Sequence, residues 1–219
     1  MSDDGETDDI SIKVVLLGET TVGKTSIITR YSKNSFSPYV MATANPSCVL
    51  KIIEIDENKI VKLKIWDTAG QERYRAVSKM IYRNASVVLL VYDITNESSF
   101  NAIKKYWLKE ITENSPENII IAVVANKSDE YIEQKVPTED GKELAKQLNA
   151  IFTSTSAKSG DGIDELFRTV EEKYLYPEKD ISQTYLNKDE IEEKKKKIIL
   201  EKCKNSKNKE KKKKKKCCE

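Results

Sequence analysis

The stretch Gly18-Glu19-Thr20-Thr21-Val22-Gly23-Lys24-Thr25 decides the fold of this chain. It matches the pattern G-x-x-x-x-G-K-[ST], in which a glycine-flanked loop surrounds a phosphate group. The preceding run Ile10–Leu17 is apolar and rich in β-branched residues, which predicts a buried strand. From Ser26 to about Tyr31 the chain has no glycine or proline, which predicts a helix. Together these elements predict an anion site, because backbone N–H groups and the positive end of the helix dipole converge on the loop.

Individual residues of this loop have predicted contacts. Lys24 reaches the β- and γ-phosphates of a nucleotide, and the Thr25 hydroxyl ligates Mg²⁺. The predicted phosphate-binding set is Gly18, Thr20, Thr21, Val22, Gly23, Lys24, Thr25 and Ser26. The alternative is a chance glycine loop between a strand and a helix, which motifs farther along the chain disfavour.

Charge is distributed unevenly along the chain. The 219 residues carry 38 Lys and Arg against 36 Asp and Glu, a formal net charge of +2. The first nine residues hold five acids and no base, whereas Lys194–Glu219 holds fourteen lysines and three glutamates. The remainder is therefore net acidic, which argues against a nucleic-acid-binding core and predicts a separate partner for the basic tail.

Length and cysteine usage narrow the class of protein. A chain of this length predicts one domain with tails. No apolar run approaches the roughly 20 residues of a membrane span, and the acidic start differs from the basic start of a signal peptide. Only Cys48 lies outside the lysine-rich tail, so no disulfide framework is indicated and a cytosolic compartment fits.

Strands and helices are predicted to alternate along the rest of the chain. A hairpin is expected first, then helices and strands in turn, with Asn96 or Thr95 capping the second long helix and Thr138 the next. This order predicts an α/β fold with a doubly wound, mostly parallel six-stranded sheet and one antiparallel strand. The expected strands after the first are Cys48–Ile55, Lys59–Trp66, Ser86–Tyr92, Ile119–Ala125 and Ile151–Ser154, and the expected helices are 76–83, 97–111, 139–148 and 163–174.

Three further polar motifs each follow a predicted strand. In Asp67-Thr68-Ala69-Gly70-Gln71, the carboxylate of Asp67 suits Mg²⁺, Gly70 allows close approach to a γ-phosphate, and Gln71 can orient an attacking water. Ligands bind at the carboxyl ends of the strands in such sheets. All the motifs are therefore expected to form one site.

The other two motifs indicate a purine. In Asn126-Lys127-Ser128-Asp129, the Asp129 carboxylate can accept two hydrogen bonds from guanine but not from adenine, and the Lys127 stem can cover the base. In Ser156-Ala157-Lys158 the backbone N–H of Ala157 can donate to a purine O6. Either motif alone is a common polar turn.

The four motifs, in this order, resemble the guanine-nucleotide motifs of the Ras superfamily over about residues 10–176. The segments Lys64–Tyr74, Tyr82–Ala85 and Leu90–Thr95 are similar to the Rab branch, and to its endosomal members most of all. The resemblance implies a P-loop NTPase fold of the small G-protein type, with GTP or GDP and Mg²⁺ as ligands. It implies that Thr43 ligates Mg²⁺, that Phe36 lies against the guanine, and that Gln71, Lys24 and Gly70 take part in catalysis.

The same resemblance implies a function and a chain layout. The expected function is a membrane-anchored GTP/GDP switch in vesicle trafficking that hydrolyses GTP slowly without an activating protein. Expected partners are an exchange factor, a GTPase-activating protein, a prenyl escort or GDP-dissociation inhibitor, effectors and an anionic membrane, but no nucleic acid. The protein is expected to be a monomer. Its expected location is the cytoplasmic face of an intracellular, endosomal membrane, with a second pool in the cytosol. The expected parts are a disordered acidic N-terminus (1–9), a GTP-binding domain (10–176) and a flexible tail (177–219).

Two features leave alternatives open. Cys217 and Cys218 resemble the Rab signal for double prenylation, although the acidic Glu219 follows them, and stray free thiols are the alternative. The stretch Ala44-Asn45-Pro46 and Cys48 departs from the family pattern, which predicts divergent effectors. With Thr20 and Thr21 these changes permit a second hypothesis, a GTP-locked binding module without hydrolysis. A nucleotide kinase is disfavoured, because it lacks a use for Asn126–Asp129.

Overall fold

The computed structural model describes residues 8–41, 43, 45–56, 59–68, 81–116 and 118–178 of the chain. The chain divides into two units, Met1–Pro177 and Glu178–Glu219. Several predictions concern residues outside the described ranges: those for most of the acidic start, Ala44, Gly70, Gln71, Cys217 and Cys218. No described helix has both the length and the apolar character needed to cross a bilayer.

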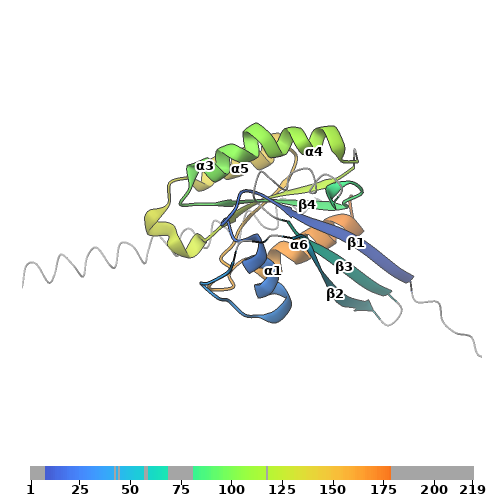
Figure 1. The fold of residues 1–219 in the computed structure, drawn as a ribbon. Helices are drawn as coiled ribbons and strands as arrows, with labels where there is room; N and C mark the ends of the chain where they lie inside the picture. Colours follow the sequence, from blue (N-terminus) through green and yellow to red (C-terminus); the bar gives the residue numbers. More distant parts are fainter. Residues whose placement is uncertain are drawn as a thin grey trace, which may run out of the picture. The chain divides into compact units, whose positions relative to one another are not determined.

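A six-stranded sheet organises the first unit, and its strands have the order β2-β3-β1-β4-β5-β6 (Figure 1). Strand β2 runs antiparallel to β3, and every other neighbouring pair is parallel. The predicted fold class is therefore confirmed. The strands are β1 (Asp8–Leu17), β2 (Ser47–Asp56), β3 (Lys59–Asp67), β4 (Val87–Asp93), β5 (Ile120–Asn126) and β6 (Ile151–Ser154).

Helices cover the sheet in two layers (Figure 1). Helices α1 (Lys24–Lys33) and α6 (Ile163–Leu175) pack on one face, where they bury Ile27, Ile28, Leu166 and Phe167. On the other face lie α3 (Glu97–Ala102), the π-helix η2 (Ile103–Trp107), α4 (Leu108–Asn114) and α5 (Thr138–Gln147). A short 3₁₀ helix, η3 (Ser128–Glu133), follows β5.

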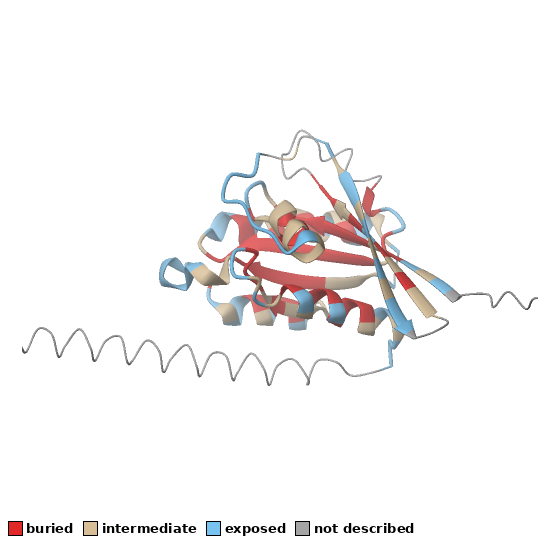
Figure 2. Cartoon of the chain, turned by 90° about the horizontal axis from the view of Figure 1, so that it is seen from below, coloured by how far each residue is buried: buried red, intermediate tan, exposed pale blue. Residues whose placement is uncertain are grey.

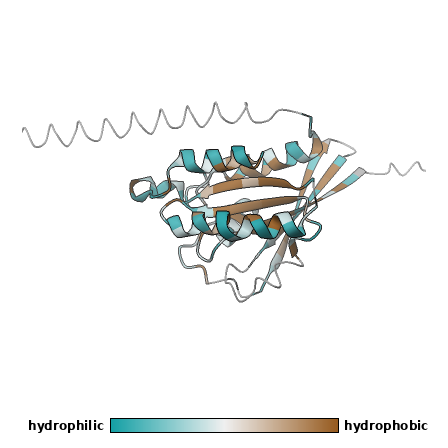
Figure 3. Ribbon diagram, turned by 90° about the horizontal axis from the view of Figure 1, so that it is seen from above, coloured by the Kyte–Doolittle hydropathy of each residue, from teal (hydrophilic) through white to brown (hydrophobic). Residues whose placement is uncertain are grey.

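The central strands are buried on both faces, as expected for parallel strands between two helical layers. Every residue of β4 is buried, and the central strands form the apolar middle of the unit (Figures 2 and 3). In β3 the predicted alternation is confirmed, since Val61, Leu63 and Ile65 are buried while Lys62 and Lys64 are not.

Three local expectations need correction. Strand β1 begins at Asp8, two residues before the apolar run, and Asp9 forms an ion pair there with Lys62 of β3. Thr138 does not cap α5: the cap is Pro137, which fixes a φ of −56° just before the first helical residue. The helix capped by Asn96 is interrupted by the π-helical turn η2, which no sequence pattern predicted.

One buried carboxylate lies where α1 and α6 meet. The Tyr31 hydroxyl of α1 donates to Oε1 of Glu171 in α6 at 3.4 Å, and the Tyr31 ring stacks on Phe167. Burial raises the pKa of Glu171 to about 7, although the Tyr31 hydrogen bond opposes the shift. The folded protein therefore binds this proton more tightly than the unfolded chain does.

This burial predicts a pH-dependent stability. The pKa of Glu171 is higher in the folded protein than in the unfolded chain. The stability that the protonated side chain contributes is therefore present at pH 4.5 and is lost as the pH rises to about 7. Glu171→Gln should therefore raise the free energy of unfolding at pH 8 by on the order of 2 kcal/mol. Urea unfolding at pH 5 and pH 8, with excess Mg²⁺–GDP, measures the effect, with the exposed Glu133→Gln as control. Equal pH slopes in the two variants and the wild type would contradict it.

Candidate functional site

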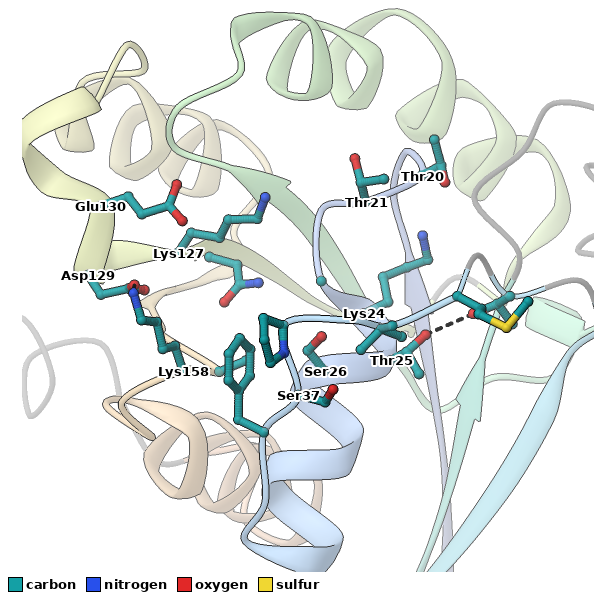
Figure 4. A pocket seen from close by; sticks show the side chains of 18 of the residues that line it. Thr20, Thr21, Lys24, Thr25, Ser26, Ser37, Lys127, Asp129, Glu130 and Lys158 are labelled. Atoms are coloured by element: carbon teal, nitrogen blue, oxygen red, sulfur yellow. Dashed lines mark hydrogen bonds and ion pairs between the residues drawn. The ribbon is translucent and has the colours of Figure 1, made fainter.

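A cavity of about 430 Å³ opens where the carboxyl ends of the parallel strands meet (Figure 4). Its walls come from the predicted phosphate loop, the Asn126–Asp129 motif, the Ala157–Lys158 motif and the loop after α1. The lining residues are Thr20, Thr21, Gly23, Lys24, Thr25, Ser26, Phe36, Ser37, Pro38, Val40, Met41, Thr43, Thr68, Asn126, Lys127, Asp129, Glu130, Ala157 and Lys158. The structure thus brings together motifs that lie more than 100 residues apart in the sequence.

The phosphate loop owes its shape to two glycines. Gly18 has a φ of +149°, and a Cβ at that position would lie 2.2 Å from the Val91 carbonyl oxygen of β4. Gly23 has a φ of +99° and caps α1, and a Cβ there would lie 2.3 Å from Nδ2 of Asn126. No other residue fits either position, because both the backbone conformation and the close neighbours exclude a side chain. The loop can therefore wrap tightly beside the cavity, which Thr20, Thr21, Gly23 and Lys24 line.

Lys24, the first residue of α1, is folded under this loop. Its Nζ donates to the carbonyl oxygens of Gly18 and Glu19, at 2.8 Å each, and only 5% of the residue is exposed. Burial lowers the pKa of Lys24 to about 8, although Asp67 and Glu19 oppose the shift. An anion in the cavity would stabilise the charged ammonium in this desolvated position.

Three oxygen-bearing side chains meet beside Lys24. The Thr25 hydroxyl lies 2.7 Å from Oδ2 of Asp67 and 2.8 Å from the Thr43 hydroxyl, which itself lies 3.3 Å from the same Oδ2. Burial raises the pKa of Asp67, with the Thr25 hydrogen bond as the main opposing influence. The other oxygen, Oδ1, is buried without a hydrogen-bond partner among the described residues.

These three side chains fit a magnesium ion completed by phosphate oxygens. Mg²⁺ prefers oxygen ligands and binds through one or two carboxylates together with substrate phosphates. A buried, unpartnered carboxylate oxygen beside two hydroxyls supplies such a ligand set. Within the described ranges, no cluster of three or more His, Cys, Asp or Glu side chains offers a rival metal site.

The opposite end of the cavity carries Asp129. Its Oδ1 accepts a hydrogen bond from the Ser156 hydroxyl at 2.6 Å, and Nζ of Lys158 lies 3.4 Å from Oδ2. Ser156 is fully buried, so it holds the carboxylate in one orientation at the cavity wall. No acceptor in the described part of the chain takes the backbone N–H of Ala157, which remains available to a ligand.

Asn126 joins the two ends of the cavity. Its Nδ2 donates to the Val22 carbonyl of the phosphate loop at 2.7 Å, and its Oδ1 accepts from the Thr155 hydroxyl at 3.2 Å. Asn126 lines the cavity, and these bonds also make it a positioning residue between two loops. The sequence pattern alone did not indicate that second role.

Two charged residues that support the site were missed from the sequence. Asp93, at the end of β4, lies 2.6 Å through Oδ2 from Nζ of Lys127, and its Oδ1 accepts from the backbone N–H of Thr95. Arg30 of α1 donates to the carbonyl oxygens of Ala157 and Lys158, at 2.8 and 2.7 Å. Asp93 was detectable, because a carboxylate directly after a buried parallel strand lies at the edge of the sheet where ligands bind. Nothing in the sequence marks Arg30.

The loop after α1 closes the remaining side of the cavity. Phe36 lines it and is 37% exposed, and Thr43 contributes its hydroxyl beside Thr25 and Asp67. Ser37, Pro38, Val40 and Met41 also line the cavity, and so does Glu130 of η3; none of these was predicted. The predicted catalytic residues Gly70 and Gln71 lie outside the described residues.

Comparisons with known proteins agree with this geometry. The profile of the Ras family matches residues 13–176. Human Ras-related protein Rab-22A is 43% identical over 156 residues, covering 71% of this chain and 79% of the relative. GTP-binding protein ypt5 of Schizosaccharomyces pombe is 41% identical over 171 residues, covering 78% and 81%. Ras-related protein RABA4c of Arabidopsis thaliana is 43% identical over 162 residues, covering 74% and 72%.

Proposed function

The chain belongs to the Rab branch of the Ras family and is a GTPase, and from this premise we propose that it acts as a slow, membrane-anchored GTP/GDP switch in vesicle trafficking. The observation that carries the proposal is the cavity itself. One end of the cavity has the phosphate loop and the oxygen atoms of Thr25, Thr43 and Asp67. The other end has the carboxylate of Asp129, which a hydrogen bond from Ser156 holds in place and which suits guanine.

Each end of the cavity has a separate task in this proposal. Lys24 and the loop N–H groups bind the phosphates, while Thr25, Thr43 and Asp67 hold Mg²⁺, which neutralises phosphate charge. Asp129 accepts hydrogen bonds from the guanine, and the stem of Lys127, fixed by Asp93, covers the base. Thr43 comes from the loop after α1 and contacts Thr25, so a bond from Thr43 to Mg²⁺ would distinguish the triphosphate from the diphosphate state.

The charges among the described lining residues support the proposal of slow hydrolysis. Lysine is the only cationic residue type among its described lining residues. An activating protein that inserts an arginine would therefore accelerate the reaction, by about 10³–10⁵ in related systems. We also propose that the protein binds an exchange factor, a prenyl escort or GDP-dissociation inhibitor, and effectors.

Gln71 gives the most direct test of hydrolysis. Gln71→Leu should lower single-turnover GTP hydrolysis by about tenfold or more, because the amide that orients the attacking water is lost. GTP affinity should stay nearly unchanged, since the phosphate and guanine contacts remain. Single-turnover assays of the wild type and the variant, with fluorescent GTP titration as the affinity control, measure both quantities.

The outcomes of this assay separate the two functional hypotheses. A wild type that hydrolyses GTP and a variant that does not would support the switch. Unchanged turnover in the variant would remove Gln71 from the mechanism. A wild type that binds GTP without any turnover would favour the GTP-locked module.

Membrane attachment is proposed through Cys217 and Cys218, two lipid chains being sufficient for stable anchoring. The adjacent lysines would add about 1 kcal/mol each at an anionic leaflet. Cys217→Ser with Cys218→Ser should therefore move the protein from the membrane fraction to the cytosol of expressing eukaryotic cells. Cys203→Ser is the matched control, and persistent membrane association of the double variant would refute attachment at these two thiols.

The remaining proposals concern the division of the chain into parts and the location of the protein in the cell. The domain is proposed to span residues 10–176, between an acidic segment (1–9) and the tail (177–219), and the family match over residues 13–176 supports this division. The protein is proposed to act as a monomer on the cytoplasmic face of an endosomal membrane, with a cytosolic pool and no nucleic-acid partner. The similarity to Rab-22A supports the proposed endosomal location.

A further inference from the structure

The side chain of Arg30 joins helix α1 to the turn that follows β6. Its Nε donates to the Ala157 carbonyl at 2.8 Å, and its Nη2 donates to the Lys158 carbonyl at 2.7 Å. Its Nη1 donates to the backbone carbonyl and to the side-chain oxygen of Asn34, at 3.1 and 3.2 Å. No other donor in the described part of the chain takes the Ala157 or the Lys158 carbonyl. The rigid fork of the guanidinium therefore holds two successive carbonyls of the turn at once.

The turn after β6 also has bonds of its own. The backbone N–H of Gly160 donates to the Ser156 carbonyl at 2.8 Å, so the turn closes on itself. The Ser156 hydroxyl donates to Asp129 at 2.6 Å, which ties the start of the turn to the carboxylate at the guanine end of the cavity. Ser156 is fully buried and Ala157 is 4% exposed. These bonds fix the first half of the turn, and the bonds from Arg30 fix the second half.

Ala157 is held on both of its sides by these contacts. A peptide unit is planar, so a bond to its carbonyl oxygen also sets the direction of its N–H group. The peptide before Ala157 is held by Gly160, and the peptide after Ala157 is held by Arg30. Both backbone torsions of Ala157 are therefore restricted. An N–H group that is already oriented binds an acceptor without a further cost of ordering.

Arg30 acts on the cavity from a distance. It is not among the residues that line the cavity, whereas Ala157 and Lys158 are. It follows Lys24 by six residues of α1, which places it about 9 Å farther along the helix axis. Because α1 begins at the phosphate loop, this one helix sets the spacing between the phosphate end of the cavity and the turn after β6.

We propose that Arg30 is a positioning residue for base recognition, which aims the Ala157 N–H at the 6-oxygen of guanine by holding the Ala157 and Lys158 carbonyls. This role rests on the proposed function, because it requires guanine in the cavity. Asp129 faces the N1–H and the 2-amino group of the base in that proposal. Arg30 thus controls selectivity for the 6-oxygen, separately from the selectivity of Asp129 for the 2-amino group.

Two analogues of GDP separate these selectivities. In 6-thio-GDP a sulfur atom, which is a weak acceptor, replaces the 6-oxygen, while the groups that face Asp129 are unchanged. In IDP the 6-oxygen and the N1–H remain, and the 2-amino group is missing. The affinities of the full chain for the three nucleotides are measured in excess Mg²⁺ by displacement of a fluorescent GDP. The wild type should prefer GDP over each analogue by about tenfold.

Arg30→Met removes the donors of the guanidinium and keeps a long apolar side chain. The preference for GDP over 6-thio-GDP should fall to about threefold or less, because the Ala157 N–H is no longer aimed at the 6-position. The preference for GDP over IDP should stay at its wild-type value. Arg30→Lys should shift the first preference in the same direction, since an ammonium lacks the fork that holds two carbonyls. It keeps the comparison possible if Arg30→Met does not fold.

Asn34→Gly is the matched control. It removes the side-chain oxygen at the opposite end of the guanidinium and leaves the bonds from Arg30 to the turn in place. Asn34 has a left-handed backbone with a φ of +48°, which glycine adopts readily. Both preferences should therefore equal those of the wild type in this variant.

Several results would overturn the role of Arg30. If Arg30→Met binds all three nucleotides more weakly by one common factor, both preferences survive and the residue only supports the fold. If both preferences fall by the same factor, the residue does not act on the 6-position. A wild type that binds GDP and 6-thio-GDP equally would show that Ala157 does not select the 6-oxygen. A wild type that binds no guanine nucleotide would contradict the proposed function as well, which distinguishes the two failures.

Discussion

Asp129→Asn should weaken GTP binding by about a thousandfold, because a site built to hydrogen-bond a substrate group discriminates strongly when the pairing is lost. The wild-type carboxylate accepts the Ser156 hydroxyl at 2.6 Å and is held at the cavity wall. An asparagine amide would turn an N–H donor toward the N–H donors of guanine. The same variant should bind xanthosine triphosphate better than GTP, since xanthine presents a carbonyl where guanine has its amine.

Competitive displacement of a fluorescent guanine nucleotide measures both affinities. Glu130→Gln is the matched control, because Glu130 is the next residue, is exposed and also lines the cavity. That control should change either affinity by less than about threefold, as expected of an exposed charge. A variant Asp129→Asn with wild-type preference for GTP would show that another group selects the base.

Lys24→Ala should weaken GTP binding by about a hundredfold or more, since buried, hydrogen-bonded charges carry several kcal/mol. Two effects combine in this variant. The ammonium that would neutralise the phosphates is removed, and the carbonyl oxygens of Gly18 and Glu19 lose the donor that holds them at 2.8 Å. Isothermal titration with GDP and GTP in excess Mg²⁺ measures the loss.

Lys24→Arg separates the two effects. It keeps the charge but replaces a compact ammonium by a planar guanidinium that does not fit the same pair of carbonyl oxygens. It should also lose most of the affinity, because only 5% of Lys24 is exposed and the loop around it is tight. Lys33→Ala, at the far end of the same helix, is the control. Wild-type affinity in Lys24→Ala would mean that the loop amides alone bind the phosphates.

Much of the fold could be predicted because local patterns and tertiary packing agree. The alternation in β3 and the continuous apolar run of β4 gave both the strands and their burial. The π-helical turn Ile103–Trp107 could not be predicted, because its apolar spacing also fits an α-helix. Thr138 was mistaken for a cap, although the preceding Pro137 takes that position.

The candidate site was predictable where one motif carries a complete chemical task. The phosphate loop, Asp67 and Asp129 each follow their own strand. Strand order brings the loop and Asp129 to one cavity, and Asp67 to the hydroxyl of the lining residue Thr25. Supporting contacts were not predictable in this way. Arg30 and Asn126 act through bonds to carbonyl oxygens of Ala157 and Val22, and no sequence pattern specifies a backbone acceptor so distant along the chain.

We expect one pocket of this protein to bind a magnesium-bound guanine nucleotide. The most direct test of this expectation is to denature the purified full-length protein and identify the nucleotide and metal that are released. We expect the released material to be GDP or GTP together with Mg²⁺, each close to one equivalent per chain. Release of adenine nucleotides in similar amount, or of no nucleotide from protein that also fails to bind added GDP, would contradict it.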